Sequence, residues 1–229
     1  MIPNPMKYYC LVACLFIINI CVLAQTTTYD SSYETTYYNQ KVTLFNLLPD
    51  TKNEIIFVGN SITDIGEWAE IWQNKHVKNR GVSGDNTFGV IARLDEIVSS
   101  KPSKIFIMIG INDIAKNIPD TVVIKNYLRI IEIIKTKTPK TKLIFQSILP
   151  TNNEFTDFIR HQNKEQHILE INKALEKICL DKGLNFVNLY PAFANELGKL
   201  NKAYTNDGLH INGYGFMLWK KILQQQGLM

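Results

Sequence analysis

The sequence predicts a three-layer α/β/α sandwich built around a five-stranded parallel sheet. Strand-like and helix-like segments alternate from about residue 40 to the end of the chain, which is the pattern of helices packed on both faces of a sheet. Three of the strand segments are continuous runs of β-branched or aromatic residues, as in strands that are buried on both faces. With 229 residues, 45% of them hydrophobic, the chain can form one domain with a full core.

The expected strands end where glycine-containing or polar loops begin. In order, they cover residues 54–58, 77–80, 104–109, 142–147 and 185–189. The loops after them read GNSITD, GVSGDN, GINDI, ILPTNNE and, after a longer segment, NDGLHIN. Ligands of such sheets bind outside the carboxyl ends of the strands, so the functional site is expected in these loops.

Helices are expected between the strands. Asp85 is expected to cap the helix after the second strand, which reaches to about residue 99. Asp120 or Thr121 is expected to cap the next helix, which Pro139 stops.

Two further helices follow. The third ends at Gly183, and the last covers residues 213–226. The apolar stripe of the third consists of Ile168, Ile171, Leu175 and Ile178. Cys179 lies beside this stripe, so we interpret it as a small buried side chain rather than a catalytic thiol.

The first 24 residues are typical of a secretory signal peptide. Lys7 precedes a long apolar run, and the small residue Ala24 ends it. We therefore expect cleavage after Ala24 and export to the periplasm or the medium. The alternative is an uncleaved anchor, although the apolar run is slightly short for a spanning helix; a stable membrane span is not expected after cleavage.

The rest of the chain divides into a linker and one domain. Residues 25–39 are rich in Thr, Tyr, Ser and Asn without periodicity, which predicts a polar linker, and residues 40–229 form the domain. Three of the four cysteines lie in the signal segment, so no intrachain disulfide is expected. The net charge of +4 is spread along the chain without a recognition motif, which argues against a nucleic-acid partner.

Ser61 is the candidate nucleophile, and His210 with Asp207 is the candidate base. Ser61 directly follows the first strand in GNSITD, and a serine hydroxyl needs a base and an orienting partner to attack. Asp207 and His210 share one tight loop, where a carboxylate can hold the imidazole. A turn serine that only caps a helix, and a solvent-exposed loop, are the structural alternatives.

The other histidines carry less weight. His161 and His167 are six residues apart, a spacing that does not place them on one helical face, so neither a metal site nor a dyad is predicted. His76 lies in a loop beside a lysine. No motif indicates a metal or an organic cofactor, and none is expected.

Donors for an oxyanion are expected from two loops. Asn112 follows the third strand, and its amide can donate to developing negative charge. Gly81, after the second strand, offers a backbone N–H without a side chain. Turn chemistry alone would also explain both residues.

These motifs, in this order, resemble those of the SGNH hydrolases, also called GDSL-type esterases, which have a flavodoxin-like sandwich. The resemblance extends from about residue 40 to the end, and NRGVSGDN and RLDEI look like the branch of platelet-activating-factor acetylhydrolase-type and sialate O-acetylesterase-type enzymes. It implies Ser61 as nucleophile, Asp207 and His210 as its partners, and Ser61, Gly81 and Asn112 as the oxyanion hole.

One position departs from the family pattern. Asn60 stands where the family usually has Asp; it keeps the size and loses the charge, which Asp64 or Asp85 could partly replace. Ser83 in GVSGD only imitates a Gly-x-Ser-x-Gly elbow, because the final glycine is out of place by one.

The resemblance and the residues together predict a serine esterase that hydrolyses short acyl esters, acetyl above all. Its substrate would be a small molecule or glycan, such as an O-acetylated sialic acid or polysaccharide. Trp68 and Trp72 could stack on a sugar, although core packing is the simpler explanation. A lysophospholipase or thioesterase for longer chains, and a non-catalytic carbohydrate-binding domain, are the alternatives; the sequence makes no prediction of oligomeric state.

Overall fold

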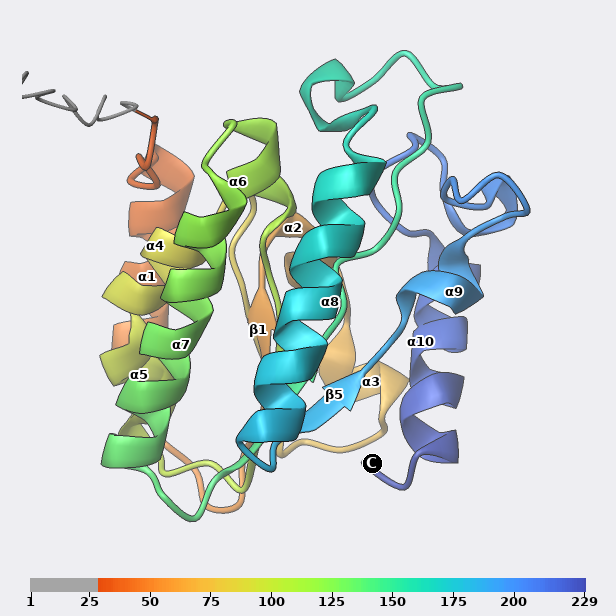
Figure 1. The fold of residues 1–229 in the computed structure, drawn as a ribbon. Coiled ribbons are helices and arrows are strands. Elements are labelled where there is room, and N and C mark those ends of the chain that lie inside the picture. The colour runs from red at the N-terminus through yellow and green to blue at the C-terminus, as the bar shows by residue number, and fades with distance from the viewer. Residues whose placement is uncertain (1–28) are drawn as a thin grey trace, which may run out of the picture.

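A computed structural model describes residues 29–229 and confirms the predicted architecture (Figure 1). The five strands are β1 (Ile55–Gly59), β2 (Val77–Gly81), β3 (Lys104–Met108), β4 (Lys142–Gln146) and β5 (Asn185–Val187). All pairings are parallel, in the order β2-β1-β3-β4-β5. Because the strands run the same way, the loops that follow them open at one edge of the sheet, as predicted.

Helices cover both faces of the sheet. One face packs against α4 (Thr87–Ala92), α5 (Leu94–Ser99), α6 (Ile111–Ala115), α7 (Asp120–Lys137) and α8 (Glu165–Asp181). The other packs against α2 (Ser61–Asp64), α3 (Trp68–Ile71), α9 (Tyr190–Phe193) and α10 (Gly213–Gln225). Alternate residues of one strand serve the two layers: Ile56 and Val58 face the first, and Phe57 faces the second.

The helix after the second strand differs from the prediction in its cap and its continuity. Asn86 caps it, accepting hydrogen bonds from the N–H groups of Phe88 and Gly89. The predicted cap at Asp85 is wrong, because that carboxylate is buried and binds Arg93 instead (2.9 Å). Arg93 also leaves the helical conformation, so α4 ends at Ala92 and α5 begins at Leu94.

The next helix, α7, has no side-chain cap. Pro119 occupies the cap position, and Asp120 is the first helical residue. Its carboxylate instead contacts the ring of His167 (3.0 Å), so the predicted cap at Asp120 or Thr121 is wrong. The third and last helices match expectation: Gly183 has a positive φ of 62° just past α8, and Cys179 is buried within that helix.

Helix α1 (Thr36–Leu47) precedes the sheet and was not expected from the sequence. The expected boundary at residue 40 falls inside it. Tyr38 of α1 is buried and donates its hydroxyl to the Gly89 carbonyl (2.9 Å), so this helix packs on the domain. The predicted signal peptide lies outside the described residues. Within residues 29–229, no helix is long and apolar enough to cross a membrane.

A short 3-10 helix, η1 (Ile159–His161), interrupts the long loop between β4 and α8. A second, η2 (Lys202–Tyr204), precedes the loop that carries Asp207. Arg160 and His161 of η1 lie in the same pocket as Ser61, which follows the first strand.

The buried pair Asp85–Arg93 links two of the loops at this edge. Arg93 also donates to the Gly59 carbonyl at the end of β1 (3.2 Å), so one guanidinium ties the exit of β1 to the loop after β2. Burial raises the pKa of Asp85 to about 6, although Arg93 acts in the opposite direction. The pair therefore holds a carboxylate in place at the cost of taking it out of water.

Replacing Arg93 with Met is expected to lower the free energy of unfolding by about 3 kcal/mol, because it leaves Asp85 buried without its cation. Urea unfolding followed by circular dichroism measures this. Arg129 is exposed on α7, so the control Arg129→Met should change the same quantity by less than about 0.5 kcal/mol. Equal losses in the two variants would contradict the structural role given to Arg93.

Candidate active site

Ser61 lies at the turn from β1 into α2. Asn60 caps α2 by accepting the N–H of Ile62 at its side-chain oxygen (3.0 Å), and Ser61 is the first helical residue. Asparagine and aspartate cap helices about equally well, so the departure from the family pattern at Asn60 preserves the local turn. Asp64 does not stand in for the lost charge at this cap, since it binds Lys41 (2.7 Å), Tyr37 and Ser83.

A continuous chain of hydrogen bonds joins Asp207, His210 and Ser61. The ring Nε2 of His210 lies 2.8 Å from Ser61 Oγ, and its Nδ1 lies 2.7 Å from Asp207 Oδ2. An ionised carboxylate only accepts, so Nδ1 carries the proton and Nε2 is free to accept from the serine hydroxyl. Residues that are 149 positions apart in the chain thus have the geometry of a nucleophile and its base.

Asp207 is held as a carboxylate by its own loop. Its Oδ1 accepts from the N–H groups of Leu209 (2.9 Å) and His210 (2.8 Å). Burial alone would raise the pKa of Asp207, but these bonds and the His210 ring outweigh it and the pKa is lowered. The group is therefore charged at neutral pH, as an orienting partner of an imidazole must be.

The structure does not support Gly81 as an oxyanion donor. Its N–H already donates to the Asn79 side chain (2.8 Å), and an added Cβ would lie 2.2 Å from the backbone nitrogen of Asp64. Gly81 is needed so that β2 and α2 can approach closely. The sequence-based assignment of this glycine to the oxyanion hole is therefore corrected.

Gly84, and not Gly81, has a backbone N–H that is available as the expected oxyanion donor. It lines the same pocket as Ser61 and has a φ of +83° with open space around its α-carbon. No residue of the described chain accepts its N–H. The positive φ favours glycine, and it leaves the N–H of the second loop available to a ligand.

Asn112 points its amide toward the same space, and two neighbours fix which way the amide faces. The Asp85 carbonyl lies 2.7 Å from Nδ2, and His161 Nε2 lies 2.9 Å from Oδ1. A carbonyl oxygen can only accept, so the Asn112 nitrogen must face it and the Asn112 oxygen must face His161. One hydrogen of the amide remains for a ligand.

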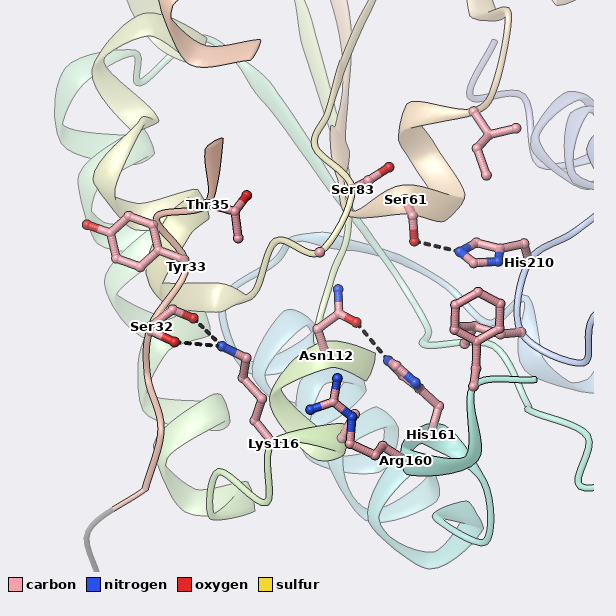
Figure 2. Close-up of a pocket in the computed structure, with 15 residues that line it drawn as sticks. Ser32, Tyr33, Thr35, Ser61, Ser83, Asn112, Lys116, Arg160, His161 and His210 are labelled. Carbon is pink, nitrogen blue, oxygen red and sulfur yellow. Dashed lines mark hydrogen bonds between the residues drawn. The ribbon is translucent and has the colours of Figure 1, made fainter. Parts of the chain in front are cut away.

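His161 is a site residue that the sequence did not reveal. Figure 2 shows its ring bonded to Asn112. Burial lowers its pKa to about 4, so the ring is neutral and carries its proton on Nε2, facing Asn112. Its Nδ1 is buried and has no partner among the described residues. Its partner lies 49 positions away on another loop, which is why spacing within the sequence gave no signal.

The pocket around Ser61 has a volume of about 540 Å³. Apolar side chains near the serine include Ile65, Phe158 and Leu209. The Phe158 ring packs edge-on against His210, with centroids 4.8 Å apart. Phe158 has a φ of +50°, a conformation that is rare for a bulky side chain and often marks functional sites.

Other sequence candidates lie elsewhere. Trp68 is buried and stacks on Phe57 with ring centroids 4.0 Å apart, so it belongs to the core, and neither Trp68 nor Trp72 lines the pocket. A sugar platform of these two residues is therefore wrong. Ser83 lines the pocket, but its hydroxyl donates to Asp64 (2.7 Å) rather than facing a histidine. Within residues 29–229, no three His, Cys, Asp or Glu side chains are placed to hold a metal ion.

The ring of His161 is expected to stay neutral, protonated on Nε2, as the pH is lowered from about 8 to about 5. Its folded pKa of about 4 lies below the ordinary value of 6.5. The unfolded chain therefore binds a proton that the folded chain does not, and His161 lowers stability as the pH falls from 6.5 toward 4. Nuclear magnetic resonance of the ring nitrogens measures the titration; a midpoint near 6.5 would contradict the buried contact with Asn112.

The chain is similar in sequence and fold to known proteins. A model of the GDSL-like Lipase/Acylhydrolase family matches residues 57–218, more than half of the chain. Platelet-activating factor acetylhydrolase IB subunit alpha2 of Homo sapiens is 27% identical over 173 residues, which cover 73% of this chain and 72% of that protein.

Solved structures show the same likeness. A GDSL-like lipase from Bacteroides thetaiotaomicron superposes with a TM-score of 0.72 at 25% identity, covering 82% of this chain and 96% of that chain. Axe2, an acetylxylan esterase from Geobacillus stearothermophilus, shares the fold, with a TM-score of 0.62 at 20% identity over 79% of this chain and 98% of that one. This chain therefore belongs to the GDSL-like lipase/acylhydrolase family and is a carboxylic ester hydrolase.

Proposed function

We propose that the protein is a serine esterase that removes short acyl groups, acetyl above all, from the hydroxyl groups of carbohydrates. The observation that carries the proposal is the hydrogen-bonded chain from Asp207 through His210 to Ser61, which ends in an open pocket. In this proposal Ser61 is the nucleophile, His210 is the general base and acid, and Asp207 orients the imidazole.

The reaction needs two transfers of the acyl group. Ser61 Oγ attacks the ester carbonyl carbon while its proton moves to Nε2 of His210. The bond from the carbonyl carbon to the alcohol oxygen then breaks, and the leaving oxygen takes the proton from His210. Water attacks the acyl group on Ser61, gives a proton to His210 and releases the acid, after which the proton returns to the serine oxygen.

Three donors support the proposed oxyanion hole. The N–H groups of Ser61 and Gly84 have no acceptor among the described residues, and Asn112 has one amide hydrogen to spare. One such donor stabilises the transition state by about 3 kcal/mol. By holding the Asn112 oxygen, His161 directs the amide nitrogen toward the substrate and so acts as a positioning residue.

The preference for a short acyl group follows from what surrounds the serine. Phe158 packs against His210, and Ile65 and Leu209 also line the pocket that contains Ser61. Similarity to a platelet-activating factor acetylhydrolase subunit gives further support for acetyl. We also propose that the chain is exported, as its N-terminal sequence predicts, which would bring it to acetylated glycans such as polysaccharides or O-acetylated sialic acids.

Replacing Ser61 with Ala is expected to lower kcat for nitrophenyl acetate by at least about 10⁴-fold, because no other described hydroxyl contacts His210 Nε2. Release of nitrophenol measures the rate, and circular dichroism checks the fold. Ser83→Ala is the control for a second pocket serine and should retain most of the activity. Comparable losses in both variants would contradict the role of Ser61.

The acyl preference is tested with nitrophenyl esters of increasing chain length. If acetyl is the preferred group, as proposed, acetate is expected to give a kcat/KM at least about 10-fold above octanoate. A higher kcat/KM for octanoate would contradict the acetyl preference and favour a lysophospholipase or thioesterase, whereas inactivity toward every ester would favour a non-catalytic carbohydrate-binding domain.

A further inference from the structure

The charged side chains that line the pocket around Ser61 are basic. Its described lining includes two cationic side chains, Lys116 and Arg160, and no aspartate or glutamate. Figure 2 shows both cations in the part of the pocket beyond Asn112, away from the Ser61–His210 pair. The proposed ester hydrolysis gives these two cations no role. They are therefore available to bind another part of the substrate.

Arg160 is held in the pocket by residues on either side of it in the chain. Phe158, two residues before it, packs on His210, and His161, directly after it, is bonded to Asn112. Both flanking contacts are made with the site itself, so the backbone of Arg160 cannot drift from the pocket without breaking them. Arg160 is exposed, and among the described residues its guanidinium has no hydrogen-bond or ion-pair partner.

The charge of Arg160 acts on the neighbouring ring of His161. Burial is the largest cause of the lowered pKa of His161, and the charges of Arg160 and His210 lower it further. Arg160 directly precedes His161 in the chain and lines the same pocket as Ser61, so its positive charge also acts on a ligand bound there.

Lys116 is the C-cap residue of α6, four residues after Asn112, and both residues line the pocket. Its ammonium group is bonded to the carbonyl and hydroxyl of Ser32 and lies 3.3 Å from Asp30. The Asp30 side chain is 61% exposed, and exposed ion pairs of this kind are weak. Lys116 is thus positioned at the pocket wall with its charge only partly offset.

We propose that Arg160 and Lys116 bind an acidic group, a carboxylate or a phosphate, on the alcohol part of the ester substrate. The inference rests on the proposed acetyl esterase activity. An acetyl group carries no carboxylate or phosphate of its own, so an acidic group of the substrate must be on the alcohol part. The planar guanidinium of Arg160 suits two parallel hydrogen bonds to either group. Lys116 adds a second positive charge on the far wall.

The test uses three acetylated methyl glycosides that differ only at carbon 6, which carries a neutral hydroxymethyl group, a carboxylate or a phosphate. Released acetate gives kcat/KM for each with the full chain. We expect at least one acidic glycoside to exceed the neutral one by about 10-fold, mainly through a lower KM. The preference should shrink as sodium chloride is raised. Whichever acidic glycoside has the higher kcat/KM shows whether the site binds a carboxylate or a phosphate.

Arg160→Gln and Lys116→Gln should each reduce the ratio of acidic to neutral kcat/KM severalfold, and the double variant should abolish it. The matched control is Arg129→Gln, which removes an exposed arginine of α7 outside the pocket and should keep the ratio. Equal kcat/KM for the three glycosides, or a ratio that survives in the double variant, would overturn the acidic subsite while leaving the esterase proposal intact. Failure to hydrolyse even nitrophenyl acetate would overturn the esterase proposal and the subsite with it.

Discussion

The hydrogen bond between His210 and Ser61 is the contact on which the site depends. It joins a loop that follows β1 to a loop near the end of the chain, and nothing local in either segment could form it. The parallel sheet makes it possible, because strands that run the same way bring their exits to one edge. The adjacent bond from His210 to Asp207 then sets the tautomer that leaves Nε2 free for the serine.

A second set of contacts positions the opposite wall of the pocket. Arg93 ties Asp85 to the exit of β1, and the Asp85 carbonyl together with His161 fixes the amide of Asn112. The loops after β1, β2, β3 and β4 are thus joined through polar groups that are buried or partly buried. Arg93 Nη1 and His161 Nδ1 have no partner among the described residues, so the individual contacts, and not a fully satisfied network, hold this wall. These contacts fix the direction of the Asn112 amide before a ligand binds.

The sequence predicts the sheet and the Ser61–His210–Asp207 arrangement because both leave local patterns: continuous apolar strands, and polar loops at their carboxyl ends. It does not distinguish Gly81, the last residue of β2, from Gly84 in the loop that follows, since only the bond from Gly81 to Asn79 shows that the Gly81 N–H is occupied. His161 leaves no local pattern, because its role depends on a contact with a distant loop. Helix α1 lacks a clear apolar face, which hides it among polar residues.

The most direct test of this account is a crystal structure of the chain after reaction with a small phosphonate ester that mimics the tetrahedral intermediate. The account predicts a bond from phosphorus to Ser61 Oγ, with the phosphoryl oxygen about 2.7–3.1 Å from the nitrogens of Ser61, Gly84 and Asn112. Phosphorus bonded to a different side chain, or a phosphoryl oxygen turned away from Gly84 and Asn112, would contradict it.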